Sequence, residues 1–379
     1  MVHYVMSDVV DEIKEREDNP ANCEYDRFVG LEHYVSGEVE IRQYGPTNML
    51  GSSMKVFHAG DILVARRNVY LRRAGVVNFD GITSGDSIVL RARDERIGRL
   101  LPFVLNSSSF WDYADKYSDG TMSKRLSPKL LMKYEFDLPE EDQQDYYADL
   151  LWAATETKVA YQDMIRTVDE LVKSQFIEMF GDPTTVIKEA TETVSDVADV
   201  RVGLVIKPTR FYSQDGSGTP AFRSLNVGEM KVNDNDWIFF TDKGMEENKK
   251  TIAQAGDVLV VRSGYPGTSC VVTEEFSGRN VVDLIIARPN QDRVLPEYLC
   301  AYTNYPHGKI QIENAQRGVA QKHFNVTMYN KMKIVVPPIE EQKKFVRLLQ
   351  QSDKSKFELQ QAIDSVDDLI RSIVQQDLN

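Results

Sequence analysis

One short stretch of this chain gathers side chains suited to binding an anionic ligand. It reads Arg66-Arg67-Asn68-Val69-Tyr70-Leu71-Arg72-Arg73, with four guanidinium groups and one amide directly after an apolar segment. An arginine can contact a phosphate or donate two hydrogen bonds to one guanine, and an asparagine can pair in a similar way with adenine. The stretch is therefore a candidate nucleic-acid contact. The alternative is a solvated loop whose arginines pair with nearby acids.

Three further polar segments are candidates for the same kind of contact. Arg262-Ser263-Gly264-Tyr265 follows an apolar segment in the second half of the chain, as the arginine-rich stretch does in the first half. Ser123-Lys124-Arg125 and Gln321-Lys322-His323 match each other as polar segments in front of two helical regions. For all three segments, ligand contact and plain solvated surface remain equally open. The candidate contact residues are Arg66, Arg67, Asn68, Tyr70, Arg72, Arg73, Ser123, Lys124, Arg125, Arg262, Ser263, Tyr265, Gln321, Lys322 and His323.

Common catalytic and cofactor-binding patterns are absent from the sequence. It contains no Gly-x-Gly-x-x-Gly, no Gly-x-x-x-x-Gly-Lys-Ser/Thr and no His-Glu-x-x-His, so the usual signs of a dinucleotide, a nucleoside triphosphate or a catalytic zinc are missing. Cys23, Cys270 and Cys300 are odd in number and not closely spaced, which argues against a disulfide framework and a zinc site. We therefore expect structural thiols, no catalytic residue, no cofactor and no metal.

Several segments occur twice at a nearly constant distance. Ala59-Gly60-Asp61-Ile62-Leu63-Val64-Ala65-Arg66 returns 196 residues later as Ala255-Gly256-Asp257-Val258-Leu259-Val260-Val261-Arg262. Val168-Asp169-Glu170-Leu171 returns as Val366-Asp367-Asp368-Leu369. A period this long is too large for one unit of a solenoid. We infer that the chain is a duplication in which each copy is a domain followed by a helix.

Those helices carry the clearest periodicity in the sequence. Apolar residues recur at spacings of three and four, which is the pattern of a coiled-coil seam. One seam comprises Tyr147, Leu150, Ala154, Thr157, Tyr161, Met164, Val168 and Leu171, and the other comprises Phe345, Leu348, Ser352, Ser355, Leu359, Ala362, Val366 and Leu369. Each helical region begins after a proline with acids in its first turn, and the first ends at Gly181-Asp182-Pro183. The sequence therefore predicts two long helices, over residues 139–182 and 339–379.

The regions in front of the helices have the composition of mixed α/β domains. Apolar runs bounded by turn residues predict strands at residues 61–65, 87–90, 257–261, 281–287 and 333–336. Glycine-rich polar stretches such as residues 213–220 predict long loops between them. Outside the shared segments the two copies barely agree, as expected if their loops bind two different ligands of one class. The predicted fold class is α+β, in a mixed arrangement.

The net charge of −13 by itself disfavours a nucleic-acid ligand. The charge is unevenly distributed, because residues 139–182 contain 3 Lys plus Arg against 11 Asp plus Glu, and residues 339–379 contain 6 against 8. The helical regions thus carry −10 of the −13, and the segments 1–138 and 183–338 are close to neutral, which leaves room for a basic face on each. No apolar run approaches the ~20 residues of a membrane helix, so we expect a cytoplasmic protein.

Two specific motifs give the chain a family resemblance. The first is Leu171-Val172-Lys173-Ser174-Gln175-Phe176-Ile177-Glu178-Met179-Phe180-Gly181-Asp182-Pro183, and the second is Gly318-Val319-Ala320-Gln321-Lys322 followed by Pro337-Pro338-Ile339-Glu340-Glu341-Gln342. Together with the two Ala-Gly-Asp-x-Leu-Val segments, they resemble the DNA specificity subunit of type I restriction-modification enzymes. The resemblance spans the chain. The first copy departs from the pattern, since Leu138-Pro139-Glu140-Glu141-Asp142-Gln143 is a blurred version of the second-copy motif.

The resemblance implies two pseudo-repeated target recognition domains separated by two long antiparallel coiled-coil helices. The domains would be residues 1–138 and 183–338, and the spacer helices residues 139–182 and 339–379. Such subunits carry no catalysis. They direct methyltransferase subunits, here expected to be two, and restriction and translocase subunits to double-stranded DNA with a bipartite, asymmetric sequence. If the helices hold the domains at a fixed separation, the two specified halves are expected about one DNA turn, ~10 bp, or a multiple of it apart.

The helices are also expected to carry the docking surface for the partner subunits. Tyr146, Trp152 and Phe176 are aromatic residues beyond what a two-helix seam can bury, and they lie among acidic clusters. Three other functions remain to be weighed: a self-contained restriction or methylating enzyme, a scaffold or adaptor without sequence reading, and a DNA-mimic inhibitor. The first would need catalytic motifs, the second would not need two diverged domains, and the third would spread acidic residues over the domains.

Overall fold

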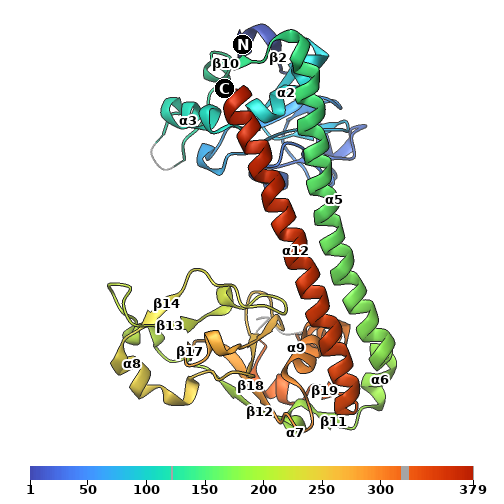
Figure 1. Cartoon of the computed structure of the whole chain (residues 1–379), viewed down its shortest axis with the longest axis vertical. Coiled ribbons are helices and arrows are strands. Elements are labelled where there is room, and N and C mark those ends of the chain that lie inside the picture. Colours follow the sequence, from blue (N-terminus) through green and yellow to red (C-terminus); the bar gives the residue numbers. More distant parts are fainter. Residues whose placement is uncertain (121–122, 317–323, 379) are drawn as a thin grey trace. The chain divides into compact units, whose positions relative to one another are not determined.

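The computed structural model describes residues 1–120, 123–316 and 324–378, and the chain divides into two compact units (Figure 1). Unit 1 comprises Met1–Asp163 and Leu359–Asn379, and unit 2 comprises Met164–Glu358. The helices α5 (Glu141–Phe180) and α12 (Ile339–Asp377) each contribute to both units. Their bounds agree with the two helices predicted from the sequence. In the described part of the chain, no helix is long and apolar enough to cross a membrane.

Each unit contains a four-stranded antiparallel inner sheet with the same strand order. In unit 1 the order is β2 (Val10–Ile13), β9 (Ser87–Ala92), β6 (Ile62–Ala65) and β7 (Ala74–Val76). In unit 2 it is β12 (Ala198–Val202), β18 (Leu284–Pro289), β15 (Val258–Val261) and β16 (Ser269–Val271). The register is also equivalent, because Val64 pairs with Ile88 and Val260 pairs with Ile285. The duplication inferred from the sequence is therefore a duplication of one sheet topology.

A smaller outer sheet accompanies the inner sheet in each unit. Its strand order is β3 (Arg16–Glu17), β5 (Met54–Phe57), β8 (Gly81–Thr83) and β4 (Phe28–Val29) in unit 1. In unit 2 the order is β14 (Ile238–Phe240), β13 (Thr219–Phe222) and β17 (Asn280–Val281). Both outer sheets contain one parallel pair, β4 with β8 and β13 with β17. The copies therefore share this pairing although their loop sequences differ.

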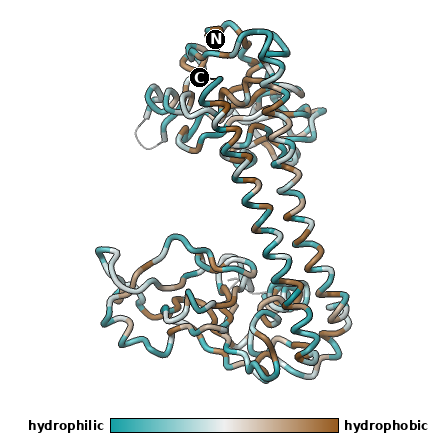
Figure 2. Tube along the Cα trace, in the orientation of Figure 1, coloured by the Kyte–Doolittle hydropathy of each residue, from teal (hydrophilic) through white to brown (hydrophobic). Residues whose placement is uncertain are grey.

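Two-stranded ribbons lead from each domain into a long helix. The ribbon of β1 (Val2–Val5) and β10 (Glu135–Leu138) precedes α5, and the ribbon of β11 (Glu192–Thr193) and β19 (Lys333–Ile334) precedes α12. The other helices of unit 1 are α1 (Met6–Val9), α2 (Glu95–Val104), α3 (Ser108–Tyr117) and α4 (Pro128–Leu131). Those of unit 2 are α6 (Pro183–Glu189), α7 (Val194–Val197), α8 (Asp242–Glu247), α9 (Pro296–Asn304), α10 (Pro306–Gln316) and α11 (Val326–Asn330). Hydrophobic residues gather inside each unit around the strands (Figure 2).

The repeated Ala-Gly-Asp sequence forms the same turn and the same ion pair in both units. The glycine in front of each aspartate has a left-handed φ, 93° in unit 1 and 85° in unit 2, which suits a residue without a Cβ atom. Asp61 and Asp257 are fully buried. Each accepts two hydrogen bonds, of 2.7 and 2.8 Å, from one guanidinium, that of Arg91 or of Arg288. The motif therefore connects the start of the central strand to the neighbouring strand.

The buried face of the long helices differs from the predicted seam by about one residue over much of its length. The buried residues of α5 are Gln144, Ala148, Leu151, Ala154, Thr155, Lys158, Val172, Phe176 and Phe180. In contrast, Met164 and Leu171 are 51% and 54% exposed. On α12 the prediction is correct at Phe345 but wrong at Leu369, which is 48% exposed. The reason is that each helix packs on its domain as well as on the other helix, and that polar Lys158 and Thr155 occupy inward positions.

Two ion pairs between α5 and α12 are related by the duplication. Lys158 Nζ lies 2.8 Å from Asp367 Oδ1 in unit 1, and Lys356 Nζ lies 2.9 Å from Asp169 Oδ1 in unit 2. The two lysines, and likewise the two aspartates, are 198 positions apart in the sequence. A polar pair at an inward position of a helix pair specifies register. The reciprocal pairs thus favour one antiparallel alignment of the helices within each unit.

Removing the lysine from these pairs should have unequal effects. Each lysine contacts a second carboxylate, Glu38 at 3.1 Å from Lys158 and Asp353 at 2.9 Å from Lys356, but the side chain of Lys158 is 10% exposed and that of Lys356 is 25% exposed. Both substitutions leave two carboxylates without their cation. Because the site of Lys158 is the more buried, Lys158→Met is expected to cost about 2 kcal/mol, against about 1 kcal/mol for Lys356→Met. Urea unfolding of the full chain, resolved by hydrogen exchange in each unit, measures both. An equal or larger loss of stability for Lys356→Met would contradict the expectation that the more buried lysine contributes more.

Candidate nucleic-acid interface

The structure brings together two of the segments proposed from the sequence. The arginine-rich stretch leaves the inner sheet at Arg66 and turns at Asn68, whose φ is 57°. Leu126 N donates to Arg66 O at 2.8 Å, and Asn68 N donates to Lys124 O at 2.9 Å. The hydroxyl of Ser123 donates to Asn68 Oδ1 at 2.8 Å. Residues 66–73 and 123–125 are therefore one surface, joined mainly through their backbones.

Acidic side chains accompany most cations of this surface. Arg125 lies 2.8 Å from Asp86, and Arg67 lies 3.8 Å from the same carboxylate. Further ion pairs join Arg72 to Asp112 at 3.4 Å and Lys124 to Asp115 at 2.6 Å. The arrangement thus agrees with the alternative of a solvated, acid-paired loop. Exposed pairs contribute only about 0–1 kcal/mol, however, so a DNA phosphate can replace a carboxylate at little cost.

The remaining residues of this surface differ in how far they reach solvent. Arg73 is half-buried and donates to the backbone oxygens of Leu31 at 2.9 Å and Arg67 at 3.2 Å. Arg66 is also half-buried, whereas Tyr70 is 63% exposed. Arg66 and Arg73 therefore stabilise the loop, and Tyr70 is the large side chain that it presents to solvent.

The equivalent surface of unit 2 is built differently. Arg262 is only 9% exposed, and its Nη1 lies 2.5 Å from Asp283 Oδ1. The expectation that Arg262 lies on an exposed surface is therefore wrong, because its guanidinium pairs with Asp283. Exposed side chains here are Ser263 and Tyr265, the latter 84% exposed. The proposed contacts Gln321, Lys322 and His323 lie outside the described residues.

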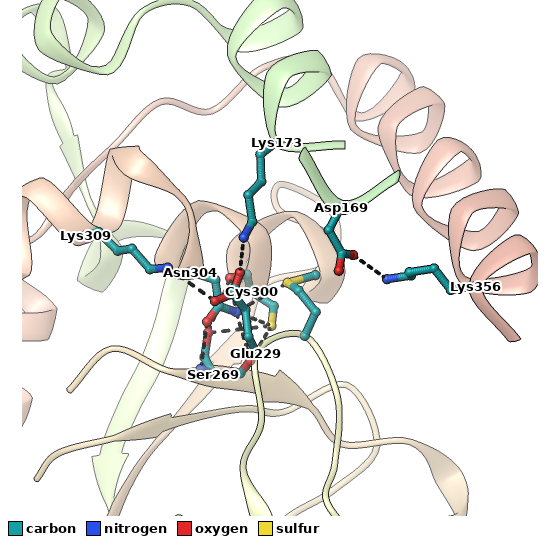
Figure 3. Close-up of polar contacts among 9 residues, drawn as sticks. Asp169, Lys173, Glu229, Ser269, Cys300, Asn304, Lys309 and Lys356 are labelled. Carbon is teal, nitrogen blue, oxygen red and sulfur yellow. Dashed lines mark hydrogen bonds and ion pairs between the residues drawn. The ribbon is translucent and has the colours of Figure 1, made fainter. Parts of the chain in front are cut away.

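In unit 2, ion pairs connect the turn at Glu229 to the helices α5 and α10 (Figure 3). Its carboxylate lies 2.7 Å from Lys173 of α5 and 3.2 Å from Lys309 of α10. Partial burial raises the pKa of Glu229, but the two lysines outweigh this and hold it below its usual value. In unit 1 the carboxylate of Glu38 contacts Lys158 in a similar way. In both units, a glutamate outside the long helices is therefore fixed to a lysine of α5.

Behind this turn, a buried amide connects the inner sheet to α9. Asn304 is 1% exposed, and its Nδ2 donates to the backbone oxygens of Ser269 at 2.8 Å and Cys300 at 3.1 Å. The same nitrogen lies 3.3 Å from the sulfur of Met230. Burial raises the pKa of the Cys300 thiol to about 12, so this thiol stays protonated. Cys300 is thus part of the packing, as predicted for a structural thiol.

Of the three aromatic residues proposed for partner docking, one lies on the surface. Tyr146 is 65% exposed. The indole of Trp152 packs edge-on against Phe103, with ring centroids 5.3 Å apart, and donates to Arg99 O at 2.9 Å. Phe176 is fully buried, so its prediction as an exposed docking residue is wrong. Periodicity could not reveal this, because most of the rings that cover Phe176 lie more than a hundred positions away in the sequence.

Sequence reasoning missed one cluster in each unit. In unit 1 the guanidinium of Arg27 lies over the rings of Tyr44 and Phe79. In unit 2 the guanidinium of Arg279 lies over the rings of Trp237 and Phe276. The available signal was a phenylalanine that recurs at the repeat distance, Phe79 and Phe276, but the arginines occupy different positions in the two copies. Both clusters lie in segments beside the strands of the outer sheets.

Comparisons with known proteins support the family resemblance. A family model described as type I restriction modification DNA specificity domain matches residues 193–366. A protein of Methanocaldococcus jannaschii that bears the name type I restriction enzyme MjaX specificity subunit is 26% identical over 174 residues. The aligned part is 42% of this chain and 38% of that relative, so the alignment spans less than half of either protein.

Two solved structures share the fold over nearly the whole chain. One is a chain from a study of complex assembly and conformational transition of the type I R-M system, with a TM-score of 0.56, 18% identity, and coverage of 99% of this chain and 97% of that chain. The other is the type I restriction-modification system S subunit from M. genitalium, with a TM-score of 0.51, 13% identity, and coverage of 98% and 95%. At these identities the likeness concerns the fold alone. Residues 193–366 thus match the model of the type I restriction modification DNA specificity domain, and the chain as a whole shares its fold with these two solved chains.

Proposed function

We propose that this chain is a DNA sequence-specificity subunit of a type I restriction-modification system. The observation that carries the proposal is the repeated inner sheet, with equivalent order and register in both units, of which the second copy lies in the matched specificity domain. Two copies of one fold with different loops suit two different half-sites. Phosphate contacts position each copy on the duplex, and base contacts specify the sequence. The recognised site is then bipartite and asymmetric.

The proposal assigns a role to each part of the chain. Residues 1–138 and 183–338 are the target recognition domains, and residues 139–182 and 339–379 are the spacer helices. Two methyltransferase subunits and the restriction and translocase subunits supply the chemistry in the cytoplasm, and this chain is non-catalytic. The absence of cofactor-binding and nucleotide-binding motifs from the sequence supports a non-catalytic role for this chain. For docking of these partners, Tyr146 stays a candidate on α5, with Trp152 as a partly buried neighbour.

Selection from a pool of random-sequence DNA duplexes tests this function. The probe is the full chain in complex with its methyltransferase subunits, because the family assembles in that form. Enriched duplexes are expected to share two short specified segments, different from each other, around a gap of fixed length and free sequence. Replacing one specified base pair by a different base pair should weaken binding by about 1–3 kcal/mol. Recovery of one continuous segment, of a palindrome, or of no common sequence would refute the proposal.

A further inference from the structure

Each unit holds one arginine against two aromatic rings. In unit 1 the Cζ atom of Arg27 lies 5.0 Å from the ring centroid of Tyr44 and 5.1 Å from that of Phe79. The two rings are 5.2 Å apart. In unit 2 the corresponding distances from Arg279 are 4.4 Å to Trp237 and 4.7 Å to Phe276, with the rings 6.1 Å apart. One cation over one ring is common in proteins, but two rings around one guanidinium in both copies are a repeated construction.

Strand pairing shows that the tyrosine and the tryptophan occupy equivalent places. In unit 1, Phe28 of β4 pairs with Ile82 of β8 and forms a bridge to Gly45 on its other side. In unit 2, Ala221 of β13 pairs with Asn280 of β17 and, on its other side, with Ile238 of β14. Gly45 and Ile238 are therefore equivalent by register. The residues directly in front of these two are Tyr44 and Trp237.

The second ring comes from the corresponding segment in both units, whereas the arginine does not. Phe79 and Phe276 lie three and four residues in front of the paired positions on β8 and β17. Arg27 directly precedes β4, whereas Arg279 directly precedes β17. The two copies thus reach the same guanidinium position from different points of the chain. A shared packing residue would have kept its place in the repeat, so the recurrence favours a functional role for the cation itself.

These two arginines form fewer and longer ion pairs with acidic side chains than the basic residues of the surface formed by residues 66–73 and 123–125. The nearest carboxylate of Arg27 is that of Asp26, at 3.8 Å and 90% exposed. Among the described residues, Arg279 has no ion pair and donates only to Glu275 O at 3.5 Å. By contrast, Arg125 lies 2.8 Å from Asp86. Ring faces hold a guanidinium by its plane and leave the N–H groups at its edge available for a planar acceptor.

We propose that Arg27 and Arg279 contact the DNA directly, one for each half of the recognised site. The inference rests on the proposed function. The edge of each stacked guanidinium donates two parallel hydrogen bonds to a planar pair of acceptors on the duplex, either the O6 and N7 atoms of a guanine or two phosphate oxygens. The rings fix the plane of the guanidinium before binding, which lowers the entropy lost on contact. Tyr44 and Trp237 are the corresponding positioning residues.

Substitution by lysine separates this role from that of a simple surface charge. Arg27→Lys and Arg279→Lys keep the positive charge but lose the planar fork. Each is expected to weaken binding to the selected duplex roughly 5- to 150-fold, the range for one lost bidentate base contact. Tyr44→Leu, which removes an exposed ring, should affect the same half of the site as Arg27→Lys. Matched controls are Arg93→Lys and Arg293→Lys, whose guanidiniums pair with Asp11 at 2.7 Å and Glu192 at 2.5 Å.

Repeating the duplex selection with each variant complex gives the decisive result. If the contact is to a base, Arg27→Lys relaxes one specified position in one half, and Arg279→Lys relaxes one in the other half. If the contact is to phosphate, both variants weaken all sequences alike and reduce the dependence of binding on salt. Unchanged affinity and unchanged sequence with either variant, at unaltered thermal stability, would overturn the inference. Failure of the unsubstituted complex to select a bipartite site would instead refute the proposed function.

Discussion

Substitution Arg91→Met is expected to lower the free energy of unfolding of unit 1 by about 2–4 kcal/mol. Asp61 is 1% exposed, and Arg91 is the cation that pairs with it. Without that guanidinium, a carboxylate stays buried with two hydrogen bonds fewer. This expected loss is smaller than the roughly 3–5 kcal/mol for breaking a completely buried ion pair, because the side chain of Arg91 is 44% exposed. Urea unfolding, followed by hydrogen exchange of the amides in β6 and β9, measures this change in the free energy of unfolding.

The second copy of this ion pair provides a control within the same molecule. Asp257 has a second cation, Arg201, at 3.6 Å in addition to Arg288. Arg288→Met should therefore destabilise unit 2 less than Arg91→Met destabilises unit 1. Arg93→Met, in an exposed pair with Asp11, should leave the stability of unit 1 almost unchanged. Equal losses for all three variants would show that burial of the aspartate does not set the cost.

Phe176→Ala is expected to destabilise unit 2 by about 3–5 kcal/mol, the range for removing a buried aromatic side chain. Phe176 is fully buried, and its ring centroid lies 4.8 to 5.5 Å from those of Phe180, Phe345, Tyr305, His307 and Tyr298. These rings come from α5, α9, α10, α12 and the residue between α9 and α10. The cavity left by alanine therefore loosens all these elements together. Loss of hydrogen-exchange protection in α9 and α12 is the expected observation.

A matched surface variant distinguishes core packing from partner docking. Tyr146→Ala removes a 65% exposed aromatic side chain and should change stability by less than about 0.5 kcal/mol. If it weakens assembly with the methyltransferase subunits at unchanged stability, α5 docks a partner near its start. If Phe176→Ala left exchange protection intact but abolished assembly, the assignment of Phe176 to the core would be incorrect.

Local sequence patterns were sufficient to predict the duplication, the two long helices and the central strands of both inner sheets. The repeated Gly-Asp segments predicted both central strands, β6 and β15, and the apolar run of residues 281–287 predicted much of β18. The proline-started helices were predicted within two residues of α5 and α12 at nearly every end. These features depend on interactions between near neighbours, such as caps, turns and alternation. The same motifs carry the resemblance to the family whose model matches residues 193–366.

Side-chain surroundings were decided only by the tertiary structure. The pattern of α5 placed its inward face one residue away from the observed one, since the positions of Lys158 and Thr155 are set by acids and domain surfaces distant in the sequence. Whether an arginine is exposed, as for Arg67, or buried, as for Arg262, depends on a carboxylate about twenty residues away across a sheet. The cluster around Arg27 brings together three segments in the same way. Sequence periodicity reports which side of an element is apolar, but charge pairing and ring packing depend on distances that exist only after the sheets and helices have packed.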